Sequence, residues 1–269
     1  MLVIGENINA TNKAVGKAIT SRDTTFLEEL AKAQADAGAN YIDVNVGTGT
    51  TSPDREVADM EWLVELVQTV TDKPLVIDSD NISVIEAGLR RNHSQNPIIN
   101  SVNAEAEKLS ALGHLAVKHG ASLVALSMGA DGIPSSVEER LAACDKIMEG
   151  LSAAGVAPGQ IFFDPLVLPI SVDSEQGMIT LRTLEEIKSR YPEAGTVMGL
   201  SNISYGLPQR KVINRGFLLM AAYAGLDAVI VNPLDVKMMG FVRVAEMLMG
   251  SDPYCKGYLR AHRKGTVVD

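Results

Sequence analysis

The segment 75-LVIDS-79 contains the pattern on which the fold interpretation depends. Three apolar residues, 75–77, are followed directly by a polar residue, Asp78. Apolar residues on both faces indicate a fully buried strand, because a half-buried strand would alternate apolar and polar residues. The same pattern recurs along the chain, and we predict strands at residues 2–4, 41–46, 75–77, 98–99, 123–126, 161–163, 196–200 and 228–231.

Amphipathic helical segments separate these apolar runs. Residues 28–38 carry apolar side chains at helical spacing and end at Gly38, a residue type that commonly ends a helix. Pro53 suits the first position of the next helix. Ser135 and Glu138, three residues apart, predict a capping box before a further helix. Three more helices are predicted at residues 181–191, 214–225 and 241–249.

The number and order of these units predict the fold class. Eight strand–helix units in about 250 residues match the size of an α/β protein of the (β/α)8 TIM-barrel type. An open doubly wound sheet is the alternative, but it usually has a glycine-rich first turn. Here the first turn reads Gly5-Glu6-Asn7-Ile8-Asn9, which is not that motif. No linker or low-complexity segment divides the chain, so we expect a single domain over residues 1–269.

The charge and the composition exclude several classes of protein. The 24 Lys and Arg against 33 Asp and Glu give a net charge of −9, so neither a nucleic acid nor a membrane is expected as partner. No apolar run reaches the roughly 18–20 residues of a membrane helix, and the first residues lack the basic segment of a signal peptide. Cys144 and Cys255 form no CxxC pair, which indicates a reducing, cytoplasmic compartment.

Polar side chains follow almost every predicted strand. In a TIM barrel the carboxyl ends of the strands surround the active site. The residues that follow a predicted strand are Glu6, Asn7, Asn9, Asp78, Asn100, Asp164, Ser201, Asn202 and Asn232, and the second strand itself carries Asp43 and Asn45. None of the 4 histidines ends a strand, so we predict no metal site. No Lys or Arg ends a strand either, which weighs against a sugar phosphate or a Schiff-base aldolase.

These residues also have ordinary structural interpretations. Asp78 could cap the following helix, Asn100 could stabilise a turn, and Asn202 could hold its own loop. Asp43 lies inside an apolar run, and we interpret it as structural because a buried aspartate needs partners. Taken together, however, the carboxylates and carboxamides favour a flat heterocycle that carries adjacent N–H donors and a carbonyl, such as a pterin.

Several motifs resemble those of the methyltetrahydrofolate:corrinoid methyltransferases. They are Gly5-Glu6-Asn7-Ile8-Asn9, Leu75-Val76-Ile77-Asp78-Ser79, Ile99-Asn100-Ser101-Val102-Asn103-Ala104-Glu105, Asp164-Pro165-Leu166, Gly199-Leu200-Ser201-Asn202-Ile203-Ser204 and Ile213-Asn214-Arg215. The resemblance extends from residue 1 to about residue 249. It implies a pterin-binding TIM barrel, usually a homodimer. It also implies transfer of a methyl group between N5 of tetrahydrofolate and the cobalt of a corrinoid (cobalamin) carried on another protein.

The resemblance assigns roles to individual residues. Asp78, Asn100 and Asp164 would bind the pterin ring of tetrahydrofolate or 5-methyltetrahydrofolate. Asn202 would hydrogen-bond near N5 and the methyl group, with Ser201 beside it. The chain departs from the acetogenic members of the family after this pair, where Tyr205 replaces a glutamine, and in its tail, residues 251–269. Both departures bear on the identity of the corrinoid protein and on the direction of transfer.

An N5 amine leaves readily only when it is protonated, so the transition state of methyl transfer to cob(I)alamin carries positive charge at N5. We predict that Asn202, directly or through water, stabilises this charge electrostatically rather than acting as a general acid. The DxHxxG signature of a corrinoid domain is absent, so the corrinoid is expected on a separate protein that docks at the barrel mouth.

Two alternatives remain at this point. Dihydropteroate synthase is another pterin-binding barrel, but it needs a Ser-Arg-Lys motif late in the barrel, where this chain reads Gly199-Leu200-Ser201-Asn202. A non-catalytic folate-binding barrel would carry the same polar groups at its mouth, and only an assay of methyl transfer distinguishes it.

Overall fold

The computed structural model describes residues 1–49, 51–130 and 132–268. In this part of the chain, eight parallel strands close into a barrel in which each strand pairs with the next and β8 returns to β1. The strands are β1 (Leu2–Asn9), β2 (Tyr41–Asn45), β3 (Leu75–Asp78), β4 (Ile98–Val102), β5 (Ser122–Leu126), β6 (Ile161–Asp164), β7 (Gly195–Gly199) and β8 (Ala228–Val231). The predicted TIM barrel is therefore confirmed, and the doubly wound alternative is wrong.

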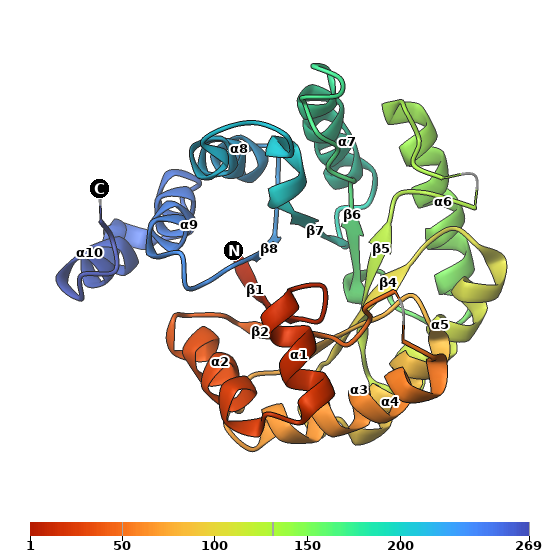
Figure 1. Cartoon of the computed structure of the whole chain (residues 1–269). Coiled ribbons are helices and arrows are strands. Elements are labelled where there is room, and N and C mark those ends of the chain that lie inside the picture. The colour runs from red at the N-terminus through yellow and green to blue at the C-terminus, as the bar shows by residue number, and fades with distance from the viewer. Residues whose placement is uncertain (50, 131, 269) are drawn as a thin grey trace.

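Helices connect the strands and surround the barrel (Figure 1). They are α1 (Lys13–Ser21), α2 (Thr24–Asp36), α3 (Pro53–Gln68), α4 (Ile82–Arg91), α5 (Ala106–His119), α6 (Val137–Ala153), α7 (Gln176–Arg190), α8 (Arg210–Tyr223), α9 (Val236–Leu248) and α10 (Lys256–Arg263). In Figure 1, α10 lies outside this ring, next to α9. It belongs to the tail, residues 251–269, whose last residue, Asp269, lies outside the described residues.

The predicted capping box at Ser135 and Glu138 is wrong by one residue. The N-cap of α6 is Ser136, whose hydroxyl accepts a hydrogen bond from the backbone N–H of Glu139. The Glu139 carboxylate in turn accepts from the backbone N–H of Ser136. Both pairs have the three-residue spacing of a capping box, so only the backbone conformation, extended at Ser136, distinguishes them.

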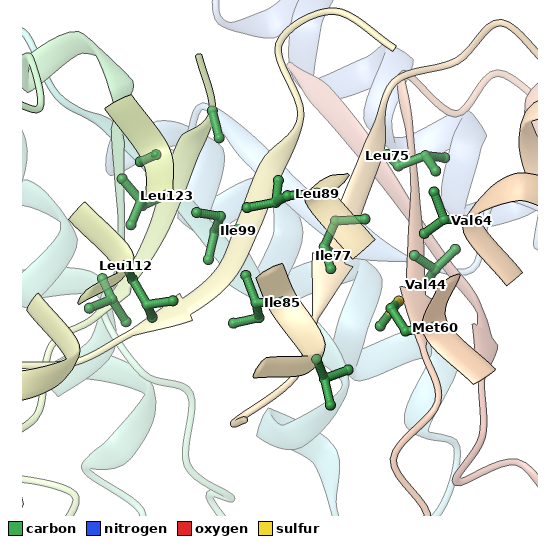
Figure 2. Close-up of a cluster of buried hydrophobic side chains, with 14 of the residues drawn as sticks. Val44, Met60, Val64, Leu75, Ile77, Ile85, Leu89, Ile99, Leu112 and Leu123 are labelled. Atoms are coloured by element: carbon green, nitrogen blue, oxygen red, sulfur yellow. The ribbon is translucent and has the colours of Figure 1, made fainter. Parts of the chain in front are cut away.

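The main core lies between the barrel wall and the helices outside it. Figure 2 shows outward-facing side chains of the strands packed against α3, α4 and α5. The labelled residues of this cluster are Val44, Met60, Val64, Leu75, Ile77, Ile85, Leu89, Ile99, Leu112 and Leu123. Burial of one such side chain contributes about 1.5–3 kcal/mol, so this layer supplies much of the stability that holds the strands in register.

A second, smaller apolar layer fills the barrel interior. It consists of one buried residue from each of six strands, namely Ile4, Val76, Ile98, Val124, Val197 and Ala228. The half-buried Tyr41 and Phe162 pack against it from the other two strands, β2 and β6. Because successive side chains of a strand point to opposite faces, the next inward-facing residue comes two positions later. Those residues form the next layer toward the carboxyl ends of the strands.

This next layer, the upper layer, determines the chemistry of the barrel mouth. Two positions after the apolar layer, the eight strands present Glu6, Asp43, Asp78, Asn100, Leu126, Asp164, Gly199 and Ile230 in order from β1 to β8. The change from apolar to polar therefore falls within single strands, one step along the inward face. No helix among the described residues is both long and apolar enough to cross a membrane.

Candidate functional site

A cavity of about 700 Å³ lies over the upper layer, at the carboxyl ends of the strands. We call it the mouth cavity, and its lining consists of Glu6, Asn7, Asn9, Thr11, Asn12, Ala14, Val15, Phe26, Leu30, Asp43, Asp78, Asn100, Gly199, Ser201, Asn202, Ile230 and Asn232. Four of the five predicted site residues, Asp78, Asn100, Ser201 and Asn202, therefore face one cavity. Asp164 is not part of this lining.

Carboxylates and carboxamides of neighbouring strands are hydrogen-bonded at the floor of the mouth cavity. Asn45 and Asn100 flank Asp78 in the parallel register of β2, β3 and β4. The Asn45 Nδ2 donates to Oδ2 of Asp78 at 2.8 Å, and the Asn100 Nδ2 donates to Oδ1 of Asp43 at 3.4 Å. These bonds orient Asp78 and Asn100, so that their remaining acceptors and donors can bind a planar ligand edge.

The three acidic residues that line the mouth cavity have raised pKa values. Burial raises the pKa of Asp78 to about 6, although the hydrogen bond from Asn45 opposes the shift. Burial, together with the nearby Asp78, raises the pKa of Asp43 well above its usual range. Burial also raises the pKa of Glu6 to about 7. Carboxylates that are this poorly solvated gain most from a ligand that donates N–H groups or carries positive charge.

Asp164 occupies the end of β6 and supports a loop. Its Oδ1 accepts from the backbone N–H of Leu166 at 2.8 Å, and its carbonyl oxygen accepts from the Ser127 hydroxyl at 2.7 Å. Arg140, a fully buried residue of α6, donates to the carbonyl oxygens of Pro165 and Leu166 at 2.8 and 2.9 Å. Burial raises the pKa of Asp164 to about 6.

Ser201 and Asn202 lie on a short 3₁₀ helix, η2 (Leu200–Ser204), which follows β7. The Arg210 guanidinium donates to the carbonyl oxygen of Ser201 at 2.6 Å and to the Ser204 hydroxyl at 3.1 Å. The Ser204 hydroxyl in turn donates to Oδ1 of Asn214 at 2.7 Å. These bonds tie η2 to α8, so the exposed Asn202 side chain projects from a fixed turn rather than from a free loop.

Several lining residues had no role assigned from the sequence. Glu6, Asn7 and Asn232 come shortly after the predicted apolar runs 2–4 and 228–231, and this position in the sequence could have identified them as candidates. The Asn7 Nδ2 donates to Oδ1 of Asn232 at 2.9 Å, which links the ends of β1 and β8. Phe26 and Leu30 of α2 add an apolar wall that no strand-end pattern could have predicted.

Neither a metal cluster nor a disulfide marks the site in the described ranges. No group of three or more His, Cys, Asp or Glu side chains within residues 1–49, 51–130 and 132–268 is arranged to hold a metal ion. Cys144 is buried and Cys255 is half-buried, and both are free thiols. The polar side chains that line the mouth cavity are carboxyl, carboxamide and hydroxyl groups.

Solved structures with the same fold include pterin enzymes. A dihydropteroate synthase of Yersinia pestis with a bound pterine–sulfa conjugate superposes with a TM-score of 0.69 at 19% identity and 93% coverage of both chains. The 7,8-dihydropteroate synthase of Vibrio fischeri gives the same TM-score of 0.69 at 17% identity, again with 93% of both chains covered. Identities this low establish the fold alone.

Sequence comparison is more specific. The family model described as "Pterin binding enzyme" matches residues 5–232. A methylcorrinoid:tetrahydrofolate methyltransferase of Eubacterium limosum is 33% identical over 269 residues, which cover 99% of this chain and 98% of the relative. A methionine synthase of Mycobacterium tuberculosis is 32% identical over 253 residues, which cover 89% of this chain but 21% of that longer protein. The chain therefore belongs to the pterin-binding enzymes and, within them, to the family of the methyltetrahydrofolate:corrinoid methyltransferases.

Proposed function

We propose that this enzyme transfers a methyl group between N5 of tetrahydrofolate and the cobalt of a corrinoid carried on a separate protein. The observation that carries the proposal is the continuous polar floor formed by Asp43, Asp78 and Asn100 beneath a cavity of about 700 Å³. The full-length similarity to a methylcorrinoid:tetrahydrofolate methyltransferase supports the same reaction.

The floor matches the edge of a pterin ring. A pterin presents an amino group and a ring N–H beside a carbonyl, and Asp78 can accept from the two donors. Asn100 can donate to the carbonyl or accept from a ring N–H, because a carboxamide offers both functions. In this proposal Asp164 supplies a third contact from β6 once the ring is bound, and Ser201 borders the ring beside Asn202.

Asn202 is proposed to act at the reacting nitrogen. Asn202 lines the same cavity as Asp78. It lies on η2, which follows β7, whereas Asp78 ends β3 on the opposite side of the barrel mouth. A ring held by its amino-bearing edge at β3 and β4 would direct its opposite edge, which includes N5, toward this side. There the carboxamide of Asn202 can stabilise the charge that develops on N5.

A separate corrinoid protein is proposed to dock over the mouth cavity. The loop of residues 205–208 borders η2, and the Tyr205 side chain is 63% exposed. We propose that the corrinoid protein covers this loop, so that the corrinoid enters the mouth cavity from the η2 side. The homodimer and the cytoplasmic location that the sequence predicts stay predictions.

A spectrophotometric assay tests the proposed function. The purified enzyme is mixed with 5-methyltetrahydrofolate and cob(I)alamin, and in the reverse direction with tetrahydrofolate and methylcobalamin. We expect interconversion of the two cobalamin spectra in both directions, slower than with the physiological carrier. Binding of tetrahydrofolate without any methyl transfer would favour the non-catalytic folate-binding barrel.

The same preparation serves to test the dihydropteroate synthase alternative. That reaction expels pyrophosphate, which needs cationic side chains at the site. Within the described residues the lining of the mouth cavity contains no Lys or Arg. We therefore expect no condensation of a pterin pyrophosphate with p-aminobenzoate.

A further inference from the structure

Glu6 lies where two cavities meet. It lines the mouth cavity and also a smaller neighbouring cavity of about 380 Å³, the side cavity, whose lining is Glu6, Leu200, Ser201, Arg210, Lys211, Asn214, Val231, Asn232, Asp235 and Met238. Glu6, Ser201 and Asn232 border both. The end of β1 thus brings a carboxyl group to the η2 side of the mouth, the side on which Asn202 projects.

Among the described residues this carboxyl group has charged neighbours but no ion-pair partner. The charged residues that share its two cavities are Asp43, Asp78, Arg210, Lys211 and Asp235. Arg210 donates to Ser201 and Ser204, and the Lys211 ammonium pairs with Asp235 at 3.5 Å. None of the ion pairs within the described ranges includes Glu6, and burial raises its pKa to about 7 despite a hydrogen bond from the backbone of Asn232.

We propose that Glu6 is the proton donor and acceptor for N5 during methyl transfer, an inference that rests on the proposed function. In the forward direction the electron pair of cobalt(I) forms the cobalt–carbon bond and the carbon–N5 bond breaks. The Glu6 proton moves to N5. The products are methylcobalt(III), tetrahydrofolate with an N5–H group, and the Glu6 carboxylate. In reverse, N5 attacks the methyl group, cobalt(I) leaves with the bonding pair, and Glu6 takes the N5 proton.

Glu6 suits this role better than Asp43 and Asp78, the other two acidic residues that line the mouth cavity. Asp43 is 2% exposed and its Oδ1 already accepts a hydrogen bond from Asn100, so it is less accessible to N5 than the partly exposed Glu6. Asp78 is bonded to Asn45 and lies toward the ring edge that the proposal places away from N5. Glu6 therefore amends the sequence-based prediction that Asn202 acts without a general acid: Asn202 stabilises the charge, and Glu6 supplies the proton.

The role predicts opposite pH dependences in the two directions. Forward transfer needs protonated Glu6, so its single-turnover rate should fall as pH rises through about 7. Reverse transfer needs the carboxylate, so its rate should rise through the same pH. A group that merely holds the fold would affect both directions alike.

Glu6→Gln tests the role, because the amide keeps the size of the side chain but cannot exchange this proton. We expect the forward rate near pH 6 to fall on the order of 100-fold and both pH limbs to disappear. Tetrahydrofolate affinity should change by less than about threefold. A potentiometric difference titration of the two free proteins should show one fewer group ionising near pH 7. Glu29→Gln is the matched control, since Glu29 is exposed on α2 outside both linings.

The outcomes separate this inference from the proposed function. Wild-type enzyme that transfers no methyl group in either direction would overturn both. Active wild-type enzyme with pH limbs of the same sign in the two directions would overturn the role of Glu6 alone, even if Glu6→Gln did not fold. A folded Glu6→Gln enzyme with wild-type limbs would also overturn it.

Discussion

The two halves of the barrel mouth differ although they are built by the same repeating unit. At the upper layer, β1 to β4 contribute four polar side chains in succession, Glu6, Asp43, Asp78 and Asn100. The corresponding residues of β5 to β8 are Leu126, Asp164, Gly199 and Ile230. One half of the mouth is thus suited to binding a polar ring edge. The other half is less polar at this level, with Asp164 as its one polar residue of the four, and η2 adds Ser201 and Asn202 to the cavity lining.

This difference indicates that different parts of the mouth serve ligand binding and methyl transfer. Buried acceptors and donors on rigid strands are oriented before the ligand arrives, which favours affinity and specificity. The Gly199 position leaves space at the end of β7, where a Cβ would meet no atom within 4 Å. Space at that point can accommodate the methyl group and the approaching cobalt. We therefore expect substitution of Asp78 to change folate binding, and substitution of Asn202 on η2, like that of Glu6, to change the rate.

The largest effect is expected for Asn202→Ala on the second side. Loss of one preorganised group that stabilises transition-state charge typically lowers a rate on the order of 100- to 1,000-fold. The side chain is exposed, so its removal should leave the fold intact. Stopped-flow measurement of methyl transfer to cob(I)alamin should show the loss in the rate, with tetrahydrofolate affinity reduced by less than about threefold. A turnover near that of the wild type would exclude this role.

A smaller effect, on the other parameter, is expected for Asp78→Asn. The substitution removes a charge-assisted hydrogen bond from a buried site, which costs about 1.5–3 kcal/mol. Tetrahydrofolate affinity should therefore fall by about tenfold or more, and titration calorimetry measures it directly. The transfer rate at saturating folate should change less than the affinity. Unchanged affinity would remove Asp78 from the site and with it the proposed orientation of the ring.

Asp164→Asn sharpens the comparison, because Asp164 is the polar member of the second half. Its Oδ1 already accepts from Leu166, so less of its acceptor capacity remains for a ligand than at Asp78. We expect a loss of affinity of about threefold, smaller than for Asp78→Asn. A loss as large as that of Asp78→Asn would mean that the β6 loop closes on the ring. An unchanged affinity would mean that Asp78 of β3 and Asn100 of β4 bind the pterin ring without Asp164.

The sequence predicts the fold better than it predicts the site. Strands such as β3 are apolar on both faces, and that pattern requires a sheet that is covered on both sides. The end of each strand also identifies Asp78 and Asn100. The sequence cannot show that Asp164 bonds to its own loop, or that Phe26 reaches the cavity from α2, because both depend on packing between distant segments. It also cannot rank Glu6 above its neighbours, because the absence of a cationic partner is a property of the folded mouth.

The smallest expected effect is on stability, and it concerns the two acidic residues Glu6 and Asp78 of the first half. Burial raises the pKa of Asp78 to about 6 and that of Glu6 to about 7, above their values of 3.8 and 4.5 in an unfolded chain. Between about pH 4 and pH 7 the folded state therefore binds more protons than the unfolded state, so the free energy of unfolding from these groups falls as pH rises.

Thermal unfolding of the ligand-free enzyme at successive pH values measures this dependence. The double variant Glu6→Gln, Asp78→Asn should lose part of the decline, and its Tm should exceed that of the wild type by a few degrees at neutral pH relative to acidic pH. Glu29→Gln, which removes an exposed carboxylate, should retain the wild-type decline. An unchanged slope in the double variant would show that these two carboxyl groups are already well solvated in the folded enzyme. Poor solvation of these carboxylates, and the hydrogen bonds that a pterin ring donates to them, would then not explain folate binding.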